Sequence, residues 1–129
     1  VIIASISLIV GGIGIINSMF TSLLDKIMDI GIMKSIGATN KQIMLIFLLE
    51  AGLFGFIGGL IGIVLGSLSA YIVKAAASSF GFELLKFNVS LGLVLFSMAF
   101  SVLVGMLSGF IPAYQAAKLK PAEALRYGK

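Results

Sequence analysis

Cysteine and histidine are both absent from the 129 residues of this chain. Without cysteine no disulfide framework can form, and without both residue types the common zinc and haem ligand sets cannot be assembled. The same absences remove the cysteine nucleophile and the histidine base of the common catalytic triads. The sequence also lacks a GxxxxGKS or GxxxxGKT loop for nucleotide phosphates. We therefore expect no catalytic residue, no metal site and no cofactor bound directly by this chain.

Charged residues are scarce as well. They make up 11% of the chain, whereas hydrophobic residues make up 60% and the mean hydropathy is +1.19. Soluble domains carry about 25% charged residues, so a lipid bilayer is the expected surrounding of this chain. The net charge of +4 does not predict nucleic-acid binding, because the basic residues stand at the ends of apolar runs and form no stripe interleaved with aromatics.

Three long runs without any charge dominate the sequence, at 1–24, 51–73 and 87–117. About 20 helical residues cross ~30 Å of hydrocarbon, where backbone polar groups must be paired. None of the runs alternates polar and apolar residues as a barrel strand does. We predict an all-α integral membrane fold whose three transmembrane helices, connecting segment and tail lie at 1–24, 43–73, 89–111, 25–42 and 112–129.

Local signals predict where these helices end. Thr39 and Gln42 fit a capping box, so the second long helix should begin before its apolar core and extend beyond the membrane. Pro112 should end the third span, and Pro121 should start a short C-terminal cytoplasmic helix. The first run lacks the basic start of a signal peptide, and no initiator methionine precedes it, so we expect a piece of a longer protein.

The distribution of lysine and arginine predicts the orientation in the membrane. Three lysines lie in 25–42 and four basic residues lie in the tail, against two lysines in 74–88. Basic residues concentrate in the cytoplasmic connections of membrane proteins. We therefore expect a multi-pass protein of the cell membrane, with Lys34 and Lys120 on the cytoplasmic side and Ser79 outside.

The connection 25–42 contains a short amphipathic segment. Four apolar residues share about 160° of a helical wheel: Ile30, Ile32, Met33 and Ile36. Gly31, Lys34 and Ser35 lie opposite them, and Gly37 is placed to end the helix. Two interpretations fit this pattern: a helix resting on lipid headgroups, or a ridge inserted into a groove of a partner protein.

A stripe of small residues runs along the second span. Its glycines fall within about 120° of a helical wheel and predict close helix packing: Gly55, Gly58, Gly59, Gly62 and Gly66. The stripe fits packing within the chain or a sliding seam between two protomers. The expected partners are Gly105 and Gly109 of the third span and Gly11, Gly12 and Gly14 of the first.

Glu50 is the acidic residue that directly precedes the charge-free run 51–73. Acids inside a membrane are usually functional, yet a run of this length can span the bilayer by itself. Glu50 is therefore expected either to anchor the helix at the membrane interface or to form a buried polar pair.

Four stretches resemble the C-terminal part of MacB-like and FtsX-like ABC permeases: ISLIVGGIGIINSM at 6–19, DIGIMKSIGA at 29–38, FLLEA at 47–51, and IPAYQAAKLKPAEALRY at 111–127. The resemblance covers essentially the whole chain, although a glutamate is usual in the family where this sequence has Asp29. The family's preceding first span and its large extracytoplasmic domain are missing. The resemblance implies that one segment contacts the nucleotide-binding subunit: Asp29, Ile30, Gly31, Ile32, Met33, Lys34, Ile36, Gly37 and Ala38.

The function that the resemblance implies is that of a permease. ATP and magnesium would bind to a partner ATPase, and its motion would drive export or extraction of a macrolide, peptide or lipoprotein-like substrate by mechanotransmission. A homodimer or heterodimer of permeases and an extracytoplasmic adaptor protein are the further implied partners. The alternatives are a non-transporting scaffold that relays ATP-driven motion to an extracytoplasmic cell-wall enzyme, or a stand-alone three-span protein or inactive fragment.

Overall fold

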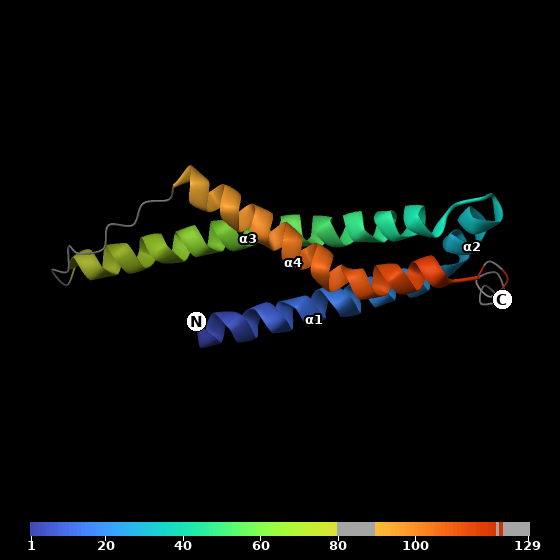
Figure 1. The fold of residues 1–129 in the computed structure, drawn as a ribbon. Helices are drawn as coiled ribbons and strands as arrows, with labels where there is room; N and C mark the ends of the chain where they lie inside the picture. The colour runs from blue at the N-terminus through green and yellow to red at the C-terminus, as the bar shows by residue number, and fades with distance from the viewer. Residues whose placement is uncertain (80–89, 121, 123–129) are drawn as a thin grey trace.

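The computed structural model describes residues 1–79, 90–120 and 122, and this part of the chain is helical without strands. The helices are α1 (Ile2–Asp25), α2 (Ile27–Ser35), α3 (Asn40–Ser79) and α4 (Leu91–Lys118) (Figure 1). By length and composition, α1, α3 and α4 can cross a membrane. This confirms the predicted all-α membrane fold with three spanning helices. The C-terminal helix predicted from Pro121 lies outside the described residues.

Helix α3 begins where its capping residues predict. The backbone N–H of Thr39 donates to Gln42 Oε1 at 2.8 Å, and the backbone N–H of Gln42 donates to Thr39 Oγ1 at 3.4 Å. The predicted capping box is therefore confirmed. The 40 residues of α3 extend over ~60 Å at 1.5 Å per residue. Since the hydrocarbon layer measures ~30 Å, α3 extends well beyond it.

The prediction that Pro112 ends the third span is wrong, because α4 continues through Pro112 to Lys118. Proline removes one intrahelical hydrogen bond and disturbs the preceding turn, and α4 changes direction along its length (Figure 1). Pro112 is fully buried, and Ala113 and Ala116 behind it are also completely buried. Packing of this last part of α4 against the other helices stabilises a helix that the local sequence disfavours.

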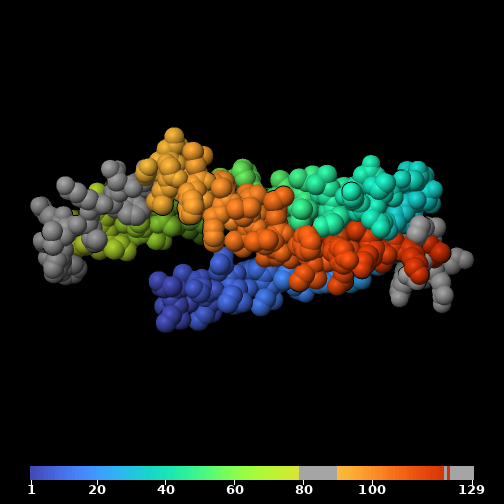
Figure 2. Space-filling view, in the orientation of Figure 1, coloured from blue at the N-terminus to red at the C-terminus, as the bar shows by residue number. Residues whose placement is uncertain are grey.

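The buried core lies at one end of the molecule, next to α2. Helices α1, α2, α3 and α4 all contribute to it, with Met19, Leu23, Ile30, Ile43, Phe47, Ala51, Ala113 and Ala116. Toward the other end, the beginning of α1 separates from α4 (Figures 1 and 2). The apolar side chains in that region are largely exposed, as Ile9 and Phe96 are at 62% and 70%. Exposed apolar residues on spanning helices suit contact with lipid.

Helices α3 and α4 approach each other closely at small residues. A Cβ added to Gly105 of α4 would lie 2.6 Å from the carbonyl oxygen of Ala51 and 2.9 Å from the Cα of Gly55. The Ser101 hydroxyl donates a hydrogen bond to the carbonyl oxygen of Gly55 at 2.7 Å. Backbone contact at these positions requires the absence of side chains, which is the usual role of small residues between membrane helices.

Candidate functional site

Helix α2 is a short, sharply bounded element between two spanning helices. Lys26 alone separates it from α1, with φ −102° and ψ 7°. At its other end, Gly37 has φ +104°, a conformation that favours glycine. The N–H groups of Gly37 and Ala38 donate to the carbonyl oxygens of Lys34 at 3.1 Å and Met33 at 2.9 Å. These two bonds form a Schellman motif, so the predicted end of the helix at Gly37 is confirmed.

The helical wheel predicted that the apolar residues of α2 share one face, but in the structure they do not. Ile30 is completely buried in the core, whereas Ile32 is 47% exposed and Ile36 is 81% exposed. Met33 is partly buried and packs against the core. Ile30 and Ile32 lie about 160° apart on the wheel, at the two edges of the predicted arc, so one can be buried while the other is exposed. Ile36 is the C-cap residue and lies past the last turn of the helix. In the structure, Ile30 and Met33 therefore face the core, whereas Ile32 and Ile36 are exposed.

Lys34 lies on the inward side of α2 rather than opposite to it. Its Nζ donates to the carbonyl oxygens of Ala117 at 2.6 Å and Leu119 at 2.5 Å. Ala117 lies in the last turn of α4 and Leu119 is its C-cap residue, at the end where helix carbonyls lack intrahelical partners and the helix dipole is negative. Burial lowers the pKa of Lys34 from its ordinary value of 10.5. Sequence reasoning missed this contact, because the acceptors are backbone atoms more than 80 positions away.

Glu50 forms an ion pair where α1, α2 and α3 meet. Lys26 Nζ lies 3.0 Å from Glu50 Oε1 and 3.1 Å from Oε2, and the Ser22 hydroxyl donates to Oε1 at 2.9 Å. Lys26 Nζ also lies 5.9 Å from the centre of the Phe47 ring. The Glu50 side chain is 24% exposed. The acid is therefore paired and partly exposed, and it connects the beginning of α3 to the junction of α1 and α2.

An open apolar groove lies between the end of α2 and the beginning of α3. Its volume is about 570 Å³, and its lining is apolar except for Gln42: Met33, Ile36, Gly37, Ala38, Gln42, Leu45 and Ile46. Asp29, in the first turn of α2, lies exposed outside this groove. The groove and the exposed isoleucines make the α2 end of the molecule a surface suited to another apolar surface.

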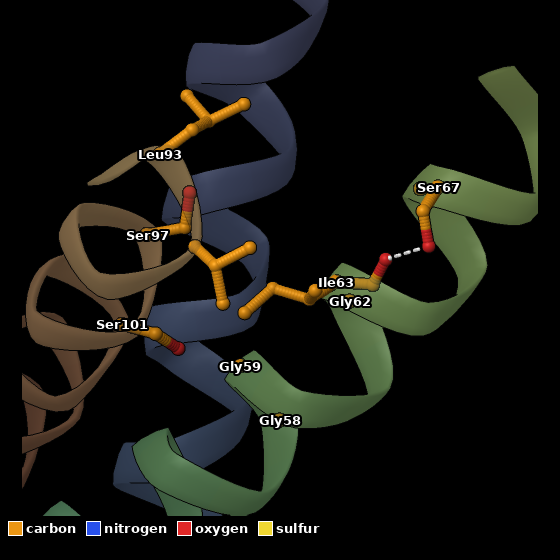
Figure 3. Close-up of a pocket in the computed structure, with 10 residues that line it drawn as sticks. Gly58, Gly59, Gly62, Ile63, Ser67, Leu93, Ser97 and Ser101 are labelled. Carbon is orange, nitrogen blue, oxygen red and sulfur yellow. Dashed lines mark hydrogen bonds between the residues drawn. The ribbon is translucent and has the colours of Figure 1, made fainter. Parts of the chain in front are cut away.

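The glycine stripe of α3 divides into two parts. Gly55 and Gly59 face α4, where an added Cβ would contact the backbone or the side chain of Ser101. No atom lies within 4 Å of a Cβ added to Gly58, Gly62 or Gly66. These three glycines line a cleft of about 370 Å³ between α3 and α4, and Figure 3 shows Ser97 and Ser101 on its α4 side.

The glycines expected to pack against this stripe also fall into two groups, those that contact α3 and those that do not. Added Cβ atoms on Gly105 and Gly109 would contact Ala51 of α3. A Cβ added to Gly12 of α1 would instead lie 3.1 Å from the Oγ of Ser108 of α4, and no atom lies within 4 Å of a Cβ added to Gly11 or Gly14. Of these three glycines of the first span, Gly12 therefore meets α4, and an added Cβ on none of them would contact the stripe of α3.

Comparison with known proteins places the chain in a family. The model of the FtsX-like permease C-terminal family matches residues 1–121. The chain is 48% identical over 126 residues to the uncharacterized ABC transporter permease YknZ of Bacillus subtilis, covering 97% of this chain and 30% of that protein. It is 44% identical over 124 residues to the uncharacterized ABC transporter permease MJ1507 of Methanocaldococcus jannaschii, covering 96% of this chain and 31% of that protein.

A third relative is the macrolide export ATP-binding/permease protein MacB of Bdellovibrio bacteriovorus, 45% identical over 126 residues, covering 97% of this chain and 18% of that protein. The chain thus spans less than a third of the length of each of these three relatives. The family match confirms the resemblance seen in residues 29–38 and in the other three stretches. This chain belongs to the FtsX-like permease C-terminal family of ABC transporter permeases.

Proposed function

We propose that this chain is the membrane-spanning part of an ABC transporter and couples ATP hydrolysis by an ATP-binding domain to movement of a substrate. That domain docks at the α2 end and holds ATP and magnesium. Family membership supports the proposal. One relative is named an ABC transporter permease, and another is named an ATP-binding/permease protein. In this proposal α2 and the tail face the cytoplasm, and the permease works as a homodimer or heterodimer, with an extracytoplasmic adaptor as a further partner.

The exposed apolar surface around Ile36 is the observation that carries the proposal. Ile36 is 81% exposed and lines the groove between α2 and α3. Exposed apolar area costs about 25 cal/mol per Å², so a stable surface of this kind needs a cover. Figure 1 places α2 at one end of the molecule, beyond the long stretches of α3 and α4.

The position of the groove along α3 favours a protein partner over lipid headgroups. The charged pair of Lys26 and Glu50 suits the edge of the hydrocarbon layer. Gln42 lies eight positions before Glu50, which corresponds to ~12 Å along the helix. The headgroup layer adds only ~5–8 Å on each side of the hydrocarbon. The groove therefore extends past the headgroups into the region where a cytoplasmic ATP-binding domain would dock.

Replacing Ile36 with aspartate tests this docking surface. In the full-length permease, Ile36→Asp should reduce recovery of the ATP-binding domain at least about tenfold, because an unpaired charge pressed against an apolar surface costs several kcal/mol. The measurement is co-purification of that domain from membranes, normalised to the membrane abundance of the permease. Ile36 is largely exposed, so insertion and folding should persist.

Met28→Asp is the matched control for this substitution. Met28 lies on α2, is 50% exposed and does not line the groove. The Met28→Asp permease should bind the ATP-binding domain at close to the normal level. If Ile36→Asp bound that domain as well as the unchanged permease did, the groove would not be the docking surface.

Thiol labelling tests the proposed orientation. Ser35 at the end of α2 and Ser78 in the last turn of α3 are both exposed, and Figure 1 shows these two helix ends at opposite ends of the molecule. In intact cells, an impermeant thiol reagent should label Ser78→Cys strongly and leave Ser35→Cys unlabelled until the membrane is opened. This chain contains no cysteine of its own, so label on it reports the introduced position. The reverse pattern would place α2 outside the cell and exclude docking of a cytoplasmic ATPase there.

A further inference from the structure

Each end of α2 is bound to a different spanning helix by a lysine. At the beginning, Lys26 pairs with Glu50 of α3 at 3.0 Å. In the last turn, Lys34 donates two hydrogen bonds to the carbonyl oxygens of Ala117 and Leu119 at the end of α4. Between these two contacts, Ile30 is fully buried in the core. The short helix is therefore held at both ends and in the middle.

The contact made by Lys34 is different in kind from the covalent connections of α2. The chain joins α2 to α1 through Lys26 and to α3 through the turn at Gly37, but it does not join α2 to α4. Within the described residues, both hydrogen bonds between α2 and the end of α4 come from Lys34. Hydrogen bonds from a charged donor are short and strong, and those of Lys34 measure 2.6 and 2.5 Å.

The acceptors are also well suited to a lysine. Leu119 caps α4 in a conformation with φ −58° and ψ 130°, and its N–H bonds to the Ala116 carbonyl oxygen at 3.3 Å. Helices often end in a left-handed glycine that pairs the last carbonyls, but α4 does not. Here Lys34, which belongs to α2, pairs carbonyl oxygens at the end of α4 instead. The end of α4 is therefore completed by α2, and the two should move together.

We propose that Lys34 is the positioning residue through which a displacement of α2 is passed to α4, while the pair of Lys26 and Glu50 passes it to α3. This inference rests on the proposed function, in which an ATP-binding domain pushes α2. It assigns a role to Lys34 that does not involve contact with that domain, because the ammonium group faces α4. Without the Lys34 contact, α2 can shift while the end of α4 stays behind.

The test uses the full-length permease bound to its ATP-binding domain in lipid nanodiscs. Spin labels are placed at Ile72, near the end of α3, and at Leu95, near the beginning of α4, which are 59% and 61% exposed. Figure 1 shows these helix ends far from α2. Any cysteines elsewhere in the complex are replaced first. The measured quantity is the change in the distance distribution between the labels when ATP with vanadate replaces the nucleotide-free state.

Lys34→Met should reduce this nucleotide-driven change to less than half of the change in the unchanged permease. Methionine keeps an unbranched side chain but cannot donate to the two carbonyls. Lys34→Arg should keep the change, because its guanidinium group can donate to both acceptors. Lys41→Met is the matched control, since Lys41 is an exposed lysine in the first turn of α3. If Lys34→Met does not accumulate in the membrane, Lys34→Leu, which also cannot donate a hydrogen bond, takes its place in the comparison.

Two results would overturn the inference. A full distance change in Lys34→Met would show that α4 moves without the lysine contact. Loss of the ATP-binding domain from Lys34→Met in co-purification would place Lys34 in the docking surface instead. Failure of the proposed function is distinguishable from both, because the unchanged permease itself would then fail to bind that domain or show no nucleotide-driven change.

Discussion

Replacing Gly105 with leucine is expected to separate α3 from α4 and to destabilise the chain by about 3 kcal/mol, the upper end of the typical range for overpacking. A Cβ at this position would lie 2.6 Å from the Ala51 carbonyl oxygen and 2.9 Å from the Gly55 Cα. Both are backbone atoms, which cannot rotate away as a flexible side chain can. The larger leucine side chain would push the two helices further apart.

The loss of stability is measured by thermal unfolding of the detergent-solubilised protein, monitored through the helical circular dichroism signal. Gly62→Leu is the matched control, because no atom lies within 4 Å of a Cβ added to Gly62. Leucine forms helices better than glycine by ~0.8 kcal/mol, so this control should be neutral or slightly stabilising in the isolated chain. Equal losses from the two substitutions would show that the contact at Gly105 is not what holds α3 to α4.

The same control gives information about the seam between protomers that the glycine stripe suggested. In the full-length complex, loss of dimer from Gly62→Leu would show that a second protomer covers Gly58, Gly62 and Gly66. An unchanged dimer would leave these glycines to face lipid. Because no atom lies within 4 Å of a Cβ added to Gly62, the substitution separates assembly from folding.

Replacing Phe47 with alanine is the second large effect, with an expected loss of about 3–5 kcal/mol, typical of removing a buried phenylalanine. Phe47 is 1% exposed and belongs to the core that joins all four helices. Its removal leaves a cavity among side chains of different helices and takes away the ring near Lys26. The core at the α2 end should therefore loosen before the long helices themselves unfold.

Thermal unfolding in detergent again gives the loss of stability, and hydrogen exchange locates it. Phe56→Ala is the matched control on the same helix, since Phe56 is 42% exposed and lies outside the core. It should cost much less, because its ring can be replaced by lipid or detergent. Faster exchange in α2 for Phe47→Ala alone is expected, whereas a uniform loss for both variants would contradict a core located at this end.

The local sequence contained what was needed to predict several parts of the fold. Length and hydropathy of the charge-free runs predicted three spanning helices, because lipid forces the backbone of such runs into helices. Thr39, Gln42 and Gly37 predicted the boundaries of α3 and α2, because each acts on backbone groups only a few positions away. Such signals act between neighbours in the chain and can be read without knowledge of tertiary contacts.

The tertiary structure decided the features that depend on residues far apart in the chain. Pro112 disfavours a helix locally, yet packing of the following alanines into the core continues α4 to Lys118. Lys34 binds backbone carbonyl oxygens at 117 and 119, which every residue type possesses and no sequence pattern marks. The stripe predicted that α3 packs closely, but only the position of α4 shows that Gly55 is covered and Gly62 is open, because hydropathy and periodicity do not specify which neighbouring helix lies on which side.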